Sequence, residues 1–156
     1  MKRPPTSLVA AAGLSVAVVA VVALAALAAP QLRRSNPEGM TKPSAYSHVV
    51  RAGNILFIAG QVSSDASGQV VGAGDMKAQV KQVLENLKRV LASEGADFGH
   101  VAKINIFTTD IAAFQEAREI REPYFAGKAP ASTLVEVKRL ARLEFLVEIE
   151  AIAVVP

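Results

Sequence analysis

Near the end of the chain, apolar residues recur at every second position, with glutamates at two of the three positions between them. In Val147–Ala153, apolar side chains occupy every second position, and Glu148, Glu150 and Ile152 stand between them. Because successive side chains of a strand point to opposite faces of a sheet, this run predicts a strand with one face against a core. The other side mixes two carboxylates with Leu146 and Ile152. That mixture fits either a solvated surface strand or a subunit interface with polar pockets.

Two amphipathic helices are predicted between the strands. Asp75 is a suitable N-cap for the first, and apolar residues recur after it at spacings of three and four until Gly95. Asp110 is expected to cap the second helix, and Pro123 to weaken its last turn because proline cannot donate the helical hydrogen bond. The second helix presents an apolar stripe of Ile111, Phe114, Ala117 and Ile120.

The remaining apolar runs predict strands. Val49–Ala52 and Ile55–Ala59 flank Gly53-Asn54, a pair typical of tight hairpins. Further strands are expected in the ranges 101–109, 134–137 and 146–155. The order of strands, helix, strand, helix and strands predicts an α+β fold, a mixed sheet with two helices on one face.

The N-terminal segment is expected to lie outside this fold. Leu8–Ala29 is an unbroken apolar run of 22 residues after the basic Met1–Arg3. As a helix it would span roughly 33 Å, enough for a membrane anchor. Ala26–Ala28 equally fits the cleavage site of a signal peptide, so residues 1–30 are interpreted as one or the other. Either places the domain outside the cytoplasm, whereas translation from Met40 would give a cytoplasmic protein.

The rest of the chain is expected to form one domain. Residues 31–44, which contain Pro37, Gly39 and Pro43, are predicted to be a linker to a domain over 45–156. From residue 40 onward the charges balance at 13 bases and 13 acids, because four of the 17 bases and one of the 14 acids precede it. A neutral domain argues against a nucleic-acid partner.

Metal sites and cysteine chemistry are not expected. The chain has no cysteine, which excludes disulfides, thiolate metal sites and a cysteine nucleophile. His48 and His100, the two histidines, match no spacing of metal ligands.

Several short motifs occur together between Tyr46 and Val155, and with them the domain resembles the RidA-like (YjgF/L-PSP) reactive-intermediate deaminases. The motifs are Tyr46-Ser47, Arg51-Ala52-Gly53-Asn54, Ala59-Gly60-Gln61, Leu84-Glu85-Asn86-Leu87, Thr109-Asp110, Tyr124-Phe125, Pro130-Ala131 and Val147–Ala153. The resemblance implies a chorismate-mutase-like fold and a homotrimer with ligand pockets at the subunit contacts. It also implies hydrolysis of small imines and enamines without a cofactor.

The resemblance also implies roles for individual residues. Glu148 occupies the position of the carboxylate that orients water, Tyr46 that of a pocket-lining tyrosine, and Gly60 that of a glycine whose backbone approaches the ligand. The family's deaminases have an arginine after Pro-Ala that grips the substrate carboxylate, and this chain has Ser132 there. A serine hydroxyl cannot form the bidentate, charge-assisted hydrogen bonds of arginine.

Two functions follow as alternatives. The first is a deaminase with altered substrate preference, in which Glu148 is the general base and Ser132 and Thr133 bind a carbonyl or hydroxyl. The second is a non-catalytic trimer that binds a small molecule in the same pocket. Arg118, where many relatives have asparagine, or Arg121 would restore a positive charge in the pocket, unless these bases pair with nearby acids on the helix surface. Ribonuclease activity, a label some relatives carry, fits the neutral domain least.

Overall fold

The structure is a computed structural model that describes residues 31–156. The predicted signal peptide or membrane anchor at Leu8–Ala29 lies outside the described residues. In residues 31–156, none of the helices has the length and apolar character needed to cross a membrane.

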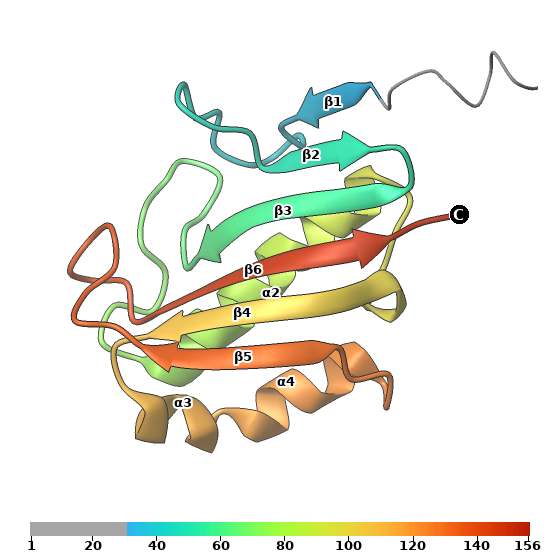
Figure 1. Cartoon of the computed structure of the whole chain (residues 1–156). Coiled ribbons are helices and arrows are strands. Elements are labelled where there is room, and N and C mark those ends of the chain that lie inside the picture. The colour runs from blue at the N-terminus through green and yellow to red at the C-terminus, as the bar shows by residue number, and fades with distance from the viewer. Residues whose placement is uncertain (1–30) are drawn as a thin grey trace, which may run out of the picture. The chain divides into compact units, whose positions relative to one another are not determined.

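A single six-stranded sheet organises the described chain, with the strand order β1-β2-β3-β6-β4-β5 (Figure 1). Neighbouring strands are antiparallel except for β4 and β5, which are parallel. The mixed sheet predicted from the sequence is therefore confirmed. The strands are β1 (Leu32–Ser35), β2 (Val49–Ala52), β3 (Ile55–Val62), β4 (Val101–Thr108), β5 (Ala131–Glu136) and β6 (Val147–Val154).

The helices pack against one face of this sheet. Helix α2 (Met76–Ser93) contacts β3 and β6, and η1 (Phe98–His100) leads into β4. The predicted cap of α2 is confirmed, because the Asp75 carboxylate accepts a hydrogen bond from the Ala78 amide at 3.0 Å.

The predicted second helix is divided in two. Ala117 separates helix α3 (Ile111–Glu116) from helix α4 (Arg118–Phe125). The backbone of Ala117 (φ −86°, ψ 15°) departs from helical values, and its amide bonds to the carbonyl of Phe114 only three residues back. Pro123 lies in the last turn of α4, which ends at Phe125, as the sequence predicted, whereas the break at Ala117 was not predicted. Both short helices run beside β5 at one end of the sheet (Figure 1).

The predicted hairpin between β2 and β3 is confirmed, with a sharper role for one residue. Gly53 has a positive φ of 60°, and Asn54 does not have a positive φ. Two-residue turns of type II′ require glycine at this first position. The turn therefore depends on Gly53 rather than on the pair.

The linker predicted over 31–44 is wrong for Leu32–Ser35, which form β1 and pair with β2. The edge of β2 offers backbone groups that need partners, and β1 supplies them. Side chains also hold β1 in place: Arg33 pairs with the buried Glu94 at the end of α2, and the Ser35 hydroxyl donates to the same carboxylate at 2.8 Å. Glu94 thus receives the partners that a buried charge requires.

The hydrophobic core lies between the sheet and the helices. The apolar positions of β6 face it: Val147 and Ala153 are fully buried, and Ile149 and Ala151 nearly so. Leu84, Leu87 and Leu91 of α2 and Phe114 of α3 fill it from the other side. The opposite face of the sheet, called the open face below, carries no helix in the described chain and leaves Phe57 of β3 47% exposed. The predicted alternation of β6 is confirmed.

Candidate functional site

Glu148 lies on the open face, directly above a glycine. In the sheet it pairs with Val62 of β3 and Phe107 of β4, and the β3–β6 register shifts between Ile58 and Gln61. A side-chain carbon on Gly60 would overlap the Glu148 carboxylate. Glycine at this irregularity of β3 therefore leaves the space that the carboxylate occupies.

The surroundings of Glu148 favour its protonated form. Burial raises the pKa of this carboxyl above its ordinary 4.5, and the charge of Glu150 raises it further. In the described part of the chain, its oxygens accept no hydrogen bond from a backbone or side-chain donor. A half-buried carboxylate with a raised pKa and open lone pairs is a suitable base for a water molecule.

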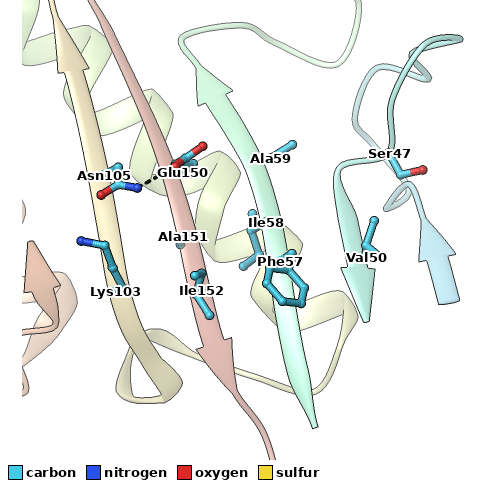
Figure 2. Close-up of a pocket in the computed structure, with 10 residues that line it drawn as sticks. All are labelled: Ser47, Val50, Phe57, Ile58, Ala59, Lys103, Asn105, Glu150, Ala151 and Ile152. Carbon is cyan, nitrogen blue, oxygen red and sulfur yellow. Dashed lines mark hydrogen bonds between the residues drawn. The ribbon is translucent and has the colours of Figure 1, made fainter. Parts of the chain in front are cut away.

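Polar groups extend from Glu150 across the open face. The Asn105 amide of β4 donates to the Glu150 carboxylate at 2.7 Å, and Lys103 Nζ donates to the Thr133 hydroxyl of β5 at 3.0 Å. Lys103, Asn105 and Glu150 line a shallow hollow of about 330 Å³ together with apolar side chains that include Phe57 (Figure 2). The open face thus combines polar anchors with exposed apolar surface.

Lys103 and Asn105 were not anticipated from the sequence. Their signal was present, because they alternate with Ile104 and Ile106, which face the core. In a strand, the residues between core positions must lie on the opposite face. The alternation that places Glu148 and Glu150 on the open face therefore places Lys103 and Asn105 there too.

Ser132 lies on the other side of the sheet from Glu148. In the parallel β4–β5 pair, Ser132 stands opposite the buried Ile104, whereas Thr133 stands opposite Asn105. Residues that pair across two neighbouring strands point to the same face of the sheet. Ser132 therefore points to the helices, and Thr133 points to the open face. Ser132 lines a cavity of about 920 Å³ between α4 and β5, here called the α4–β5 cavity.

Arg118 lines the same cavity but is already paired. Its Nε donates to a carboxylate oxygen of Glu122 at 2.6 Å, one helical turn along α4.

Tyr46 lies just before β2 and is 53% exposed. Its ring is edge-on to His48, with 5.8 Å between the ring centroids. The six predicted site residues therefore lie in four separate places in one chain. Glu148 lies over Gly60, and Thr133 is on the open face beside Lys103. Ser132 and Arg118 line the α4–β5 cavity, and Tyr46 lies just before β2.

The histidines have structural partners. His48 is buried, with Nε2 3.0 Å from the carbonyl of Thr41, and His100 Nδ1 lies 2.8 Å from Asp97. Within residues 31–156, no three histidine, aspartate or glutamate side chains are grouped in a way that would hold a metal ion.

Comparisons with known proteins agree on one family. The family model described as Endoribonuclease L-PSP matches residues 39–155. A RutC family protein of Pyrococcus horikoshii is 41% identical over 117 residues, which are 74% of this chain and 92% of that protein. The mouse 2-iminobutanoate/2-iminopropanoate deaminase is 40% identical over 70% of this chain and 80% of its own length. The crystal structure of RidA from an Antarctic Psychrobacter species matches with a TM-score of 0.73 and 28% identity, over 79% of this chain and 99% of that one.

Proposed function

Since this chain belongs to the Endoribonuclease L-PSP (YjgF/RidA) family, we propose that it hydrolyses small reactive imines and enamines with altered substrate preference. The observation that carries the proposal is the Glu148 carboxylate, half-buried over Gly60 with a raised pKa. The mouse relative, whose name states an imine deaminase, supports the reaction class. No cofactor is needed, because the chemistry uses only water and a base.

The proposed reaction begins with a water molecule held by Glu148. The carboxylate takes a proton from the water molecule while the oxygen of that water bonds to the imine carbon. Glu148 then returns that proton to the nitrogen, which gives a carbinolamine with an –NH2 group. Glu148 next transfers the proton of the new hydroxyl to the same nitrogen as the carbon–nitrogen bond breaks, so ammonia leaves and the carbon becomes a carbonyl. An enamine enters the same sequence after a proton moves from its nitrogen to its carbon, which converts it to the imine.

The proposal includes assembly into a homotrimer. Glu148 and Ser132 lie on opposite faces of one sheet, so a single chain cannot present both to one small substrate. The open face carries exposed apolar side chains, including Phe57 and Val154, that a subunit contact would cover. Contact of the open face of one copy with the α4–β5 cavity of another would complete the site with the predicted residues Tyr46, Gly60, Thr133 and Arg118 around it.

Ser132 supports the altered substrate preference. Its hydroxyl forms at most single, uncharged hydrogen bonds at the position where the family's deaminases hold a carboxylate with arginine. Ser132 and Thr133 suit a carbonyl or hydroxyl group on the substrate. We therefore expect substrates that are uncharged, or whose charged group binds to another part of the cavity.

Ribonuclease activity, which the family description names, is a weaker proposal for this chain. Acid–base cleavage of RNA commonly uses paired proton donors and acceptors, and the two histidines lie in separate, structurally occupied places. From residue 40 onward the chain has no net positive charge to attract the phosphates of RNA.

The proposal is tested by ammonia release from a panel of enzymatically generated imines, both neutral and acidic. Glu148→Gln is expected to lower kcat/KM by about 100-fold to 10,000-fold, because it removes the general base. Glu144→Gln, at an exposed glutamate paired with Arg142, is the matched control and should retain activity. Equal rates for wild type and Glu148→Gln would contradict the proposal. Ligand-dependent thermal stabilisation without any product would favour the non-catalytic binding trimer instead.

A further inference from the structure

Gln61 of β3 is a buried polar side chain that directly follows Gly60. It is 2% exposed, and it pairs across the β3–β6 ladder with Ile149, which is 1% exposed. Because paired residues point to the same face of a sheet, the Gln61 side chain lies on the face that the helices cover. The Glu148 carboxylate lies on the opposite, open face. An amide in a core is costly unless its polar atoms are hydrogen-bonded, so its partners explain its place there.

The Gln61 amide closes a bend in the backbone around Gly60, here called the Gly60 bend (residues 59–61). Gln61 Nε2 donates to the carbonyl of Ala59 at 2.8 Å, so the side chain ties the residue after Gly60 to the residue before it. The β3–β6 register shifts at the same place. Such irregularities bend a strand and change the direction of nearby side chains. The hydrogen bond therefore holds the backbone that leaves room for Glu148.

His48 supports the Gly60 bend from the end of β2. Its carbonyl accepts a hydrogen bond from the Ala59 amide at 3.0 Å, and its Nδ1 lies 3.4 Å from Gln61 Nε2. His48 Nε2 lies 3.0 Å from the carbonyl of Thr41. Because a carbonyl only accepts, Nε2 carries the hydrogen and Nδ1 is left to accept from Gln61. Both hydrogens of the Gln61 amide nitrogen thus have an acceptor.

We propose that Gln61, supported by His48, is a positioning residue for Glu148, because it fixes the Gly60 bend over which the carboxylate lies. The inference rests on the proposed function and adds to that site two residues that act through the backbone. Burial raises the pKa of Glu148 above its ordinary 4.5. A loosened bend would admit water to the carboxylate and lower that pKa toward the ordinary value.

The surroundings of Glu148 make its titration a specific measure of the bend. Val62 of β3 and Phe107 of β4, which pair with Glu148, are uncharged. Glu150 on the same strand is the charged group that raises the pKa of Glu148. Gln61 carries no charge either, so replacing it with an apolar side chain leaves these charges unchanged. A changed titration of Glu148 in such a variant therefore reports changed burial.

Gln61→Met keeps the length of the side chain and removes its hydrogen bonds. NMR of the full-length protein, labelled with ¹³C at the glutamate carboxyls, measures the titration of Glu148, whose signal is assigned with Glu148→Gln. We expect Gln61→Met to move the midpoint to lower pH. It should also lower kcat/KM for ammonia release from the imine panel by about 10-fold to 100-fold, as expected for a misplaced base. Val90→Ala, which removes a fully buried side chain of α2, is the control for lost stability and should leave the midpoint unchanged.

Two outcomes would overturn the inference: an unchanged midpoint in folded Gln61→Met, or an equal shift in Val90→Ala. If Gln61→Met does not fold, His48→Asn and His48→Phe replace it. Asparagine offers Gln61 an oxygen acceptor near the position of Nδ1 and should keep the midpoint close to that of wild type. Phenylalanine offers no acceptor and should lower the midpoint. Equal midpoints in the two folded variants would count against the inference.

Failure of this inference is distinguishable from failure of the proposed function. If Gln61 does not position Glu148, Gln61→Met keeps the Glu148-dependent ammonia release of wild type. If Glu148 is not the base, ammonia release is insensitive to Glu148→Gln, while Gln61→Met still moves the titration of the Glu148 carboxyl.

Discussion

One face of the sheet is covered by helices of the described chain, and the other face is not. The helix-covered face is closed by α2, with Leu84, Leu87 and Leu91 at most 1% exposed. The open face has no helix over it in the described residues, and it leaves Phe57 47% exposed at the hollow that Glu150 also lines. The first face belongs to a fully packed core. The second face combines exposed apolar side chains with polar ones, a composition that is typical of subunit interfaces.

This difference separates the residues that stabilise the chain from those that we propose to act on substrate. Substitutions on the helix-covered face should change the free energy of unfolding of each chain. Substitutions on the open face should change assembly, or the proton affinity of Glu148, with smaller effects on folding. The following predictions test that division, from the largest expected effect to the smallest.

Leu84→Ala should lower the free energy of unfolding by about 2 to 5 kcal/mol, because it removes a side chain that is 1% exposed and leaves a cavity in the core. Urea denaturation followed by circular dichroism measures the change. Leu143→Ala, at a leucine that is 79% exposed, is the control and should stay within about 0.5 kcal/mol of wild type. Similar losses for both variants would remove the basis of the comparison.

Gly60→Ala should disturb the open face at its closest contact. The new methyl group would overlap the Glu148 carboxylate, so we expect a loss of stability of about 1 to 3 kcal/mol. Ammonia release should also fall, because the base is displaced. Gly99→Ala in η1 replaces another glycine without a positive φ and should retain activity. Full activity of Gly60→Ala would show that the carboxylate position tolerates displacement.

Phe57→Ala should weaken the assembly more than the fold. About half of the ring is already covered in one chain, so the rest contributes about 1 kcal/mol per chain when another copy covers it. Sedimentation velocity over a dilution series should show dissociation at higher protein concentration than for wild type. An unchanged profile would mean that the open face is not the subunit contact.

Glu150→Gln should move the pH dependence of activity. Glu148 must be deprotonated to accept a proton, so kcat/KM should rise as the pH increases through its pKa, which burial and Glu150 hold above 4.5. Removing the charge of Glu150 lowers that pKa, so the acid limb should shift to lower pH. Glutamine can still accept the hydrogen bond from Asn105. If the acid limb of the pH profile did not move, a group other than Glu148 would control this part of the profile.

Most of the fold was predictable because local chemistry decides it. The cap at Asp75, the turn at Gly53 and the alternation of β6 each follow from residues close together in sequence. The strand Leu32–Ser35 was not predictable, because its partners, strand β2 and the Glu94 carboxylate about 60 residues away, lie elsewhere in the sequence. The break at Ala117 likewise reflects how two short helices pack against the sheet, which periodicity alone does not show.

The candidate site was only partly predictable. The position of Glu148 on a non-core face followed from alternation, and the structure agrees. Adjacent residues in sequence, Ser132 and Thr133, were grouped as one binding pair, yet β5 directs them to opposite faces. The placement of the Arg121 guanidinium over the ring of Phe114 depends on the packing of α3 with α4, which no spacing in the sequence specifies.

The position of β6 in the sheet has a consequence for how the protein is made. This last strand of the chain lies between β3 and β4 and carries both glutamates of the open face. Until it emerges from the ribosome, β3 and β4 have no shared neighbour, and the chain remains two unjoined parts with unpaired strand edges. A nonsense codon or proteolytic cut ahead of Val147 would therefore split the sheet at its centre rather than trim its edge.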